Sequence, residues 1–184
     1  MPNRLRLLVA FVPLITGAAA AAPVYTADGD LVPPVEYRDW VYLTSGLDMS
    51  YLAGGMGMDQ SMFDNVFVDP ASWASFKQTG HWPDKTMFEK ETRTASSHGS
   101  INKSGQFQTE ELLGVEVHVH DEARFKGGWG FFALDGTAPA KLIPYEAECY
   151  ACHRANGAVD STFTQFYPTA KPIAVKAGTF KETP

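Results

Sequence analysis

The chain has 184 residues, of which 45% are hydrophobic and 20% charged, a composition typical of one globular domain and not of a disordered chain. Its formal net charge is −6 and its pI about 5.3. This acidic balance argues against general nucleic-acid binding, which needs a positive surface. The two cysteines, Cys149 and Cys152, allow at most one disulfide.

The first 22 residues have the pattern of a cleavable secretory signal. Arg4 and Arg6 give a positive start, an apolar stretch follows over residues 7–15, and residues 18–22 are all alanine. The apolar stretch is too short to span a bilayer, although an uncleaved N-terminal anchor is the alternative. We therefore expect cleavage within residues 20–22. The mature part, residues 23–184, would be one exported domain without a membrane segment, periplasmic in a Gram-negative source.

The mature part combines strand patterns with short helical ones. Asp69 and Pro70 predict a helix start, and Gly80 its end. The expected helices are 36–43, 70–79, 145–154 and 159–166, the expected strands are 62–68, 86–94, 107–120 and 129–134, and 44–60 and 95–105 are expected loops. This order predicts an α+β fold, a mostly antiparallel sheet with flanking helices.

Residues 149–153 form a C-x-x-C-H sequence, the signature of c-type haem attachment. Two thiols three positions apart on one helical turn can each bond to a haem vinyl group, and the adjacent histidine then becomes the axial iron ligand. The sequence thus predicts one covalently bound haem c, held on a C-terminal helix by Cys149, Cys152 and His153. No methionine follows the motif, so we expect an open sixth position on the iron.

Three other readings of the cysteine pair are weaker. A thioredoxin-like pair favours a βαβ context, which the late position in a β-rich chain does not offer. A zinc site needs two further ligands at matching spacing, and a disulfide across three residues would be strained. The strand patterns also disagree with a four-helix haem bundle.

Five segments in order resemble the cytochrome P-460 family and its relatives, the cytochromes c′-beta. They are Tyr37-Arg38-Asp39-Trp40, Val68-Asp69-Pro70, residues 80–86 (GHWPDKT), the C-x-x-C-H motif and residues 163–168 (FTQFYP). The resemblance implies a dimeric, mono-haem, mostly β protein with a five-coordinate iron. It implies either oxidation of hydroxylamine or a related nitrogen oxide, or nitric oxide binding without catalysis. Plain electron transfer to a soluble redox partner is a further alternative.

The resemblance also implies roles for single residues. The enzymes of the family carry a lysine bonded to the haem, for which Lys90 is our first expectation and Lys85 the second. Glu146 is the expected acid–base carboxylate, with Glu89 and Asp135 as alternatives. The c′-beta proteins cover the haem with phenylalanines, for which the core candidates Phe63, Phe67 and Phe88 are available. Phe88 is our expectation for a haem contact, and it shares a strand face with Lys90.

For the histidines and methionines outside the motif, structural roles are simpler interpretations than metal or haem binding. His118 and His120 lie on one strand face as a metal pair would, but a solvated face is the simpler expectation. His81 and His98 are expected on surface loops. Met49, Met56 and Met58 are expected to fill space over an apolar pocket, with a sixth iron ligand as the alternative.

Overall fold

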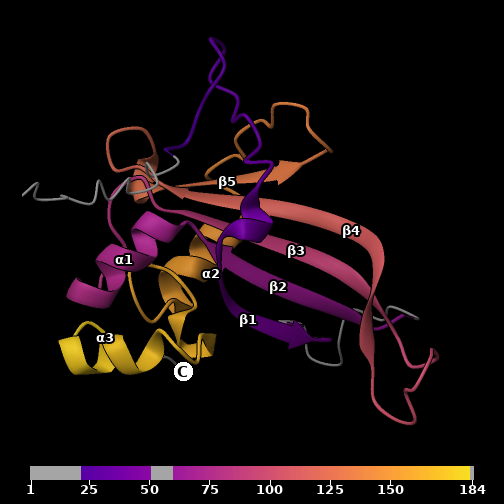
Figure 1. Cartoon of the computed structure of the whole chain (residues 1–184). Helices are drawn as coiled ribbons and strands as arrows, with labels where there is room; N and C mark the ends of the chain where they lie inside the picture. The colour runs from indigo at the N-terminus through magenta and orange to yellow at the C-terminus, as the bar shows by residue number, and fades with distance from the viewer. Residues whose placement is uncertain (1–21, 51–59, 183–184) are drawn as a thin grey trace, which may run out of the picture.

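The structure is a computed structural model that describes residues 22–50 and 60–182 (Figure 1). Its centre is a five-stranded antiparallel sheet whose strands stand in chain order. The strands are β1 (Val41–Leu47), β2 (Met62–Val68), β3 (Met87–Ser96), β4 (Phe107–His120) and β5 (Trp129–Leu134). The helices are α1 (Pro70–Thr79), α2 (Glu148–Asn156) and α3 (Lys171–Ala177), with 3₁₀ turns at Tyr37–Asp39, Lys126–Gly128 and Thr164–Phe166. The predicted α+β class is confirmed.

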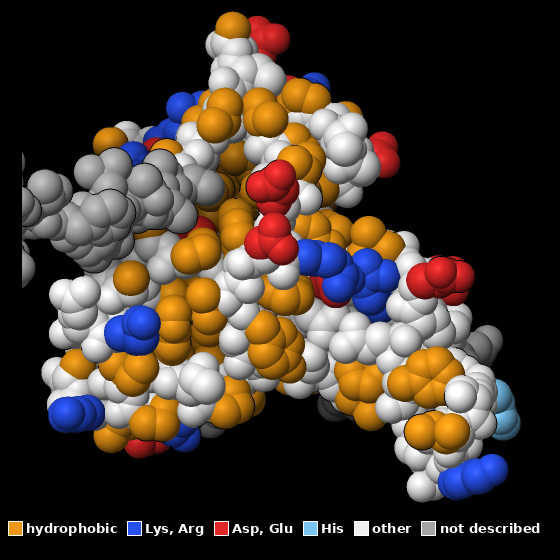
Figure 2. Space-filling model, in the orientation of Figure 1, with side chains coloured by type: hydrophobic (Ala, Val, Ile, Leu, Met, Phe, Trp, Pro, Cys, Tyr) orange, Lys and Arg blue, Asp and Glu red, His pale blue; other side chains and the backbone are white. Residues whose placement is uncertain are grey.

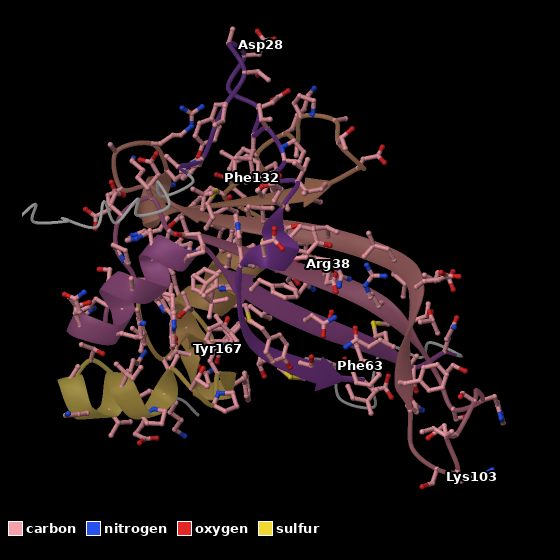
Figure 3. All side chains as sticks on the ribbon, in the orientation of Figure 1. Asp28, Arg38, Phe63, Lys103, Phe132 and Tyr167 are labelled. Atoms are coloured by element: carbon pink, nitrogen blue, oxygen red, sulfur yellow. The ribbon has the colours of Figure 1, made fainter. Side chains whose placement is uncertain are left out.

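Both faces of the sheet are covered, because alternate residues of its strands enter two separate cores. On one face Phe88 and Phe131 pack with residues of all three helices, including Phe76, Tyr150 and Ala174. On the other face a smaller cluster is covered by the N-terminal segment and by the loop after β5. In Figure 3 the labelled Phe132 and Tyr167 mark these two opposite sides. Helix α2, which carries the C-x-x-C-H motif, therefore lies on the sheet face that all three helices cover.

Helix α1 begins and ends as its sequence predicts. Asp69 Oδ1 accepts a hydrogen bond of 2.8 Å from the Ser72 amide, which caps the helix start. Asp69 Oδ2 also accepts from the Met87 amide at 3.0 Å, tying the helix to β3. Gly80 ends the helix in the left-handed conformation at φ 73°.

Replacing Asp69 with alanine should lower the free energy of unfolding by about 2–3 kcal/mol. The carboxylate is buried, so the Ser72 and Met87 amides would both lose their partner without gaining water. Chemical denaturation measures the change. Asp28→Ala, at the exposed tip of the N-terminal segment (Figure 3), is the matched control and should change little. Equal changes in the two variants would contradict the cap's role.

The prediction of a helix at residues 36–43 is wrong. Only the 3₁₀ turn Tyr37–Asp39 is helical there, and Val41 already belongs to β1. The backbone of β1 pairs with β2 from Val41 opposite Val68 to Leu47 opposite Phe63. This ladder satisfies more backbone groups than two helical turns would, and it also takes in residues 44–47 of the expected loop. Most of the remaining loop, residues 51–59, lies outside the described residues.

The prediction of a helix at residues 159–166 is also wrong. Val159 and Thr162 form a tight bridge, and only Thr164–Phe166 is a 3₁₀ turn. Thr162 and Thr164 both accept hydrogen bonds from the Trp82 indole nitrogen, which holds this segment against the core. The last helix, α3, lies further along the chain than the sequence patterns indicated. Among the described residues no helix has the length and apolar character needed to cross a bilayer.

Candidate haem-binding site

Helix α2 carries both cysteines and His153. The helix runs from Glu148 to Asn156, and the Gly157 amide donates to the His153 carbonyl at 2.9 Å to close its last turn. Cys149 and Cys152 are half-buried thiols without a disulfide. Burial raises the pKa of Cys149, and the negative charge of Glu116 on β4 contributes to the rise. Both cysteines are therefore free thiols, and Cys149 lies near Glu116 of the sheet.

The ring of His153 has a defined proton position. Its Nδ1 lies 3.0 Å from the carbonyl oxygen of Ser161. Because a carbonyl can only accept, Nδ1 must carry the proton, and Nε2 is left with a lone pair. A hydrogen bond from the second ring nitrogen to a backbone carbonyl is the usual way proteins orient a metal-binding histidine. The arrangement fits an axial ligand that binds iron through Nε2.

Apolar and aromatic neighbours hold His153 neutral. Its ring packs against Phe163 at a centroid distance of 4.4 Å, Phe131 at 4.8 Å and His118 at 5.1 Å. Burial lowers the pKa of His153 to about 4, with a further contribution from the His118 charge. At neutral pH the imidazole is therefore unprotonated at Nε2, which metal binding requires.

A close approach at Gly157 brings Ser161 under the histidine. A Cβ built on Gly157 would lie 2.5 Å from the Ser161 carbonyl carbon and 2.7 Å from the His153 oxygen. Both are backbone atoms that cannot move aside independently. Asp160 and Ser161 follow in the left-handed conformation, at φ 46° and 60°, and turn the chain back. Only glycine at position 157 leaves room for this loop.

A line of charged and polar side chains crosses the same sheet face and ends at His153. Lys90 Nζ lies 3.6 Å from Asp64 Oδ1 and 3.5 Å from Glu116 Oε1. Glu116 Oε2 lies 3.6 Å from His118 Nε2, and the His118 ring contacts His153. His118 and Lys90 hold the pKa of Glu116 down at about 2, so this carboxylate stays ionised. We call Asp64, Lys90, Glu116 and His118 the polar row.

Two predicted residues, Lys90 and Phe88, lie on this face. Lys90 is part of the polar row, and its charge acts on the pKa of His153. Phe88 is buried, with its ring 4.8 Å from Trp82, and it pairs in register with His118. The alternation of β3 thus places both residues on the side of α2.

The other predicted residues lie elsewhere. Lys85 pairs with Asp84 and Asp121, and its charge acts on Tyr25, which packs in the core on the opposite face. Glu146 is an exposed residue of the turn before α2, near enough to affect the pKa of Tyr150. The alternatives Glu89 and Asp135 line a groove that Leu113 and Val115 of β4 also line, away from His153.

The expectation of a solvated face for His118 and His120 is wrong. Their side chains keep only 19% and 12% exposure, because α2 and Trp129 cover them. Within residues 22–50 and 60–182, no three histidine, cysteine or acidic side chains are grouped to hold a metal ion. His81 pairs with Asp160, and His98 is exposed. Met49 is half-buried, and Met56 and Met58 lie outside the described residues.

Sequence reasoning missed Glu116, His118 and Asp64 as neighbours of the motif. The alternation over residues 107–120 gave the common face of Glu116 and His118, but not the helix that covers it. Asp64 joins only through the β2–β3 register, which pairs it with Thr92. No local pattern predicts such a cross-strand register.

The comparisons agree with this site. The family model for cytochrome P460 matches residues 34–164, which include the sheet and the motif. The chain therefore belongs to the cytochrome P460 family, whose members are haem proteins. A comparison with curated proteins finds no match. The predicted family is confirmed, and membership in it implies a haem cofactor.

The described residues fit a haem. His153 offers Nε2 with a fixed tautomer, and two free thiols lie on the same helix. Aromatic side chains around His153 supply an apolar wall. A haem supplies an iron that exchanges electrons with a small ligand. His153 would bind the haem iron, Phe131 and Phe163 would make its surroundings apolar, and Glu116 would place a carboxylate on the same sheet face.

Proposed function

We propose that the mature chain is a c-type cytochrome that binds one haem through Cys149 and Cys152, with His153 as the axial ligand, and oxidises hydroxylamine or a related nitrogen oxide. The observation that carries the proposal is the polar row beside a neutral, oriented histidine. Oxidising a nitrogen hydride removes protons together with electrons, so a carboxylate within reach of the substrate assists the reaction. Glu116 is ionised and lies on the face that His153 faces.

Whether Lys90 bonds to the haem distinguishes the enzymes of the family from its gas-binding proteins. Its ammonium group lies between Asp64 and Glu116, and its side chain keeps 33% exposure. A bond from lysine to a haem carbon needs the neutral amine, because the ammonium has no lone pair. The proposal therefore requires that haem attachment separates Lys90 from at least one of the two carboxylates.

Binding of nitric oxide, without catalysis, is the second proposal. The two ion pairs of Lys90 favour it, since they direct the side chain toward Asp64 and Glu116 and not toward a haem carbon. In that case the polar row serves to fix the sheet face, and the aromatic side chains provide a pocket for a small neutral ligand. Both proposals include export by the N-terminal signal, a homodimer and a soluble redox partner.

Peptide mass spectrometry after digestion distinguishes the two proposals. In the enzyme we expect the Lys90 peptide to be joined through one haem to the peptide that holds Cys149 and Cys152. In the gas-binding protein the Lys90 peptide appears at its unmodified mass. A Lys85 crosslink would contradict the structure, where this side chain pairs with Asp121.

Glu116→Gln should slow hydroxylamine oxidation by roughly 10²-fold or more, the usual contribution of a positioned proton acceptor. Glutamine keeps the size of the side chain, so haem content and fold should be unchanged. Steady-state turnover with an artificial electron acceptor gives the measurement. Glu146→Gln is the matched variant, and its exposed position predicts a smaller effect. If Glu146→Gln abolishes turnover and Glu116→Gln does not, the assignment of the carboxylate is reversed.

A further inference from the structure

A groove of about 360 Å³ opens on the sheet face opposite α2. It lies between the segment before the first 3₁₀ turn, the outer part of β4 and the turn after β5. Its walls are mostly apolar, with contributions from Pro33, Pro34, Leu112, Leu113, Val115 and Leu134. This volume is in the range of small-molecule sites, and nothing in the haem chemistry uses it.

The floor of the groove contains an unusual carboxyl group. Glu89 is fully buried, and neither of its side-chain oxygens has a hydrogen-bond partner. A buried carboxyl without hydrogen-bond partners costs free energy. A ligand that pairs with the carboxyl would offset this cost. Burial raises the pKa of Glu89 to about 9, with the Glu91 charge adding to the shift. In this fold Glu89 is therefore a neutral acid at pH 7.

Arg38 and Arg93 bind Glu91 and not Glu89. Arg38 reaches both oxygens of Glu91, at 2.8 and 2.7 Å, and Arg93 Nε lies 3.1 Å from one of them. Tyr37 donates to Glu91 at 2.7 Å. Figure 2 shows basic side chains with acidic atoms beneath them at the place that Figure 3 labels Arg38. Glu91 is thus fully paired while its neighbour Glu89 is not.

The charge of the groove indicates what it binds. Its charged lining residues are Glu89 and Asp135, and no lysine, arginine or histidine is among the described residues that line it. We propose that this groove binds a small organic cation, an ammonium ion with an apolar body, and that Glu89 becomes its counter-ion. The apolar walls take the body of the ligand and the acidic floor takes its charge.

Binding then changes the protonation of Glu89. The O–H bond of the Glu89 carboxyl breaks, the proton passes to solvent, and the carboxylate pairs with the cation. The oxygens are covered in the empty groove, so a rotamer change of Glu89 accompanies binding. The facing titratable groups are Tyr37 on the first 3₁₀ turn, Glu91 on β3 and Asp135 after β5. Tyr37 uses its proton in the hydrogen bond to Glu91, and Glu91 is itself paired, so the partnerless carboxyl of Glu89 supplies the proton.

Isothermal titration calorimetry of the haem-loaded mature chain with benzyltrimethylammonium tests the proposal, because this probe keeps its charge at every pH. The association constant should rise about tenfold per pH unit between pH 6 and 8. About one proton should be released per ligand at pH 7, measured by comparing buffers of different ionisation enthalpy. The haem absorption spectrum should not change, since the groove lies on the far face of the sheet.

Two variants separate the groove from other surfaces. Glu89→Gln cannot ionise, so the pH dependence should disappear and affinity at pH 8 should fall at least tenfold. Asp135→Asn, at the groove rim, is the matched control and should keep the pH dependence. Absence of binding, equal affinity for the uncharged benzyl alcohol, or a pH-independent association constant would each overturn the proposal.

Thermal unfolding shows that Glu89→Gln is folded and reports on the same proton. The pKa of Glu89 in the folded chain is raised above its unfolded value of 4.5 to about 9. Between these two pH values the folded chain keeps the Glu89 proton, whereas the unfolded chain has released it. Stability from this group is complete below pH 4.5 and is lost as pH rises toward 9. The midpoint temperature of the wild type should therefore fall more between pH 6 and 9 than that of Glu89→Gln. Parallel curves would show that Glu89 does not hold this proton.

Discussion

Replacing Cys149 and Cys152 together with serine should remove covalently bound haem from the chain. Denaturing gel electrophoresis with haem staining gives the measurement, because only thioether-linked haem migrates with the polypeptide. The wild-type band should stain, and the double variant should not. Each single variant keeps one thiol on the helix and should stain more weakly. The effect is the largest we expect, since Cys149 and Cys152 are the only cysteines in the sequence.

Ala151→Ser is the matched control for this experiment. Ala151 lies between the two cysteines and is exposed, so a serine there changes the same turn of α2 without removing a thiol. Its stained band should equal that of the wild type. A stained band in the double variant would show that haem attachment uses another residue. It would contradict the assignment of Cys149 and Cys152 as the attachment sites.

Gly157→Ala should lower the free energy of unfolding by about 1–3 kcal/mol and weaken the binding of His153 to the haem iron. The added Cβ would meet backbone atoms of Ser161 and His153 at 2.5 and 2.7 Å, so the loop under the histidine must move. That movement weakens the 3.0 Å contact from His153 Nδ1 to the Ser161 carbonyl and releases the ring orientation. Chemical denaturation and the haem absorption spectrum, which is sensitive to the ligands of the iron, measure the two effects.

Gly114→Ala provides the control for the glycine substitution. A Cβ at Gly114 has no heavy atom within 4 Å, and the residue lies on β4 away from the motif. Its effect on stability should stay within about 0.5 kcal/mol. If both variants behave like the wild type, the Ser161 loop does not orient His153, and its ring must be held by the aromatic neighbours alone.

Local sequence patterns determined much of this protein. The strands at 62–68 and 107–120 agree with the structure to the residue, because two-residue alternation is a property of the strand itself. Asp69, Pro70 and Gly80 predicted the bounds of α1 through capping and backbone geometry. The C-x-x-C-H motif placed Cys149, Cys152 and His153 on one helix, because its spacing is local to one helical turn.

Pairing between distant segments decided the rest. Residues 41–47 are a strand because β2 offers them a ladder, although their apolar spacing also matches a helix. The polar row exists because the registers of β2, β3 and β4 place Asp64, Lys90 and Glu116 side by side. The same alternation sends Glu89 to the opposite face, away from the haem residues and into a groove. Sequence determines which side chains share a strand face, but only the packed structure decides what covers that face, since the cover comes from segments far along the chain.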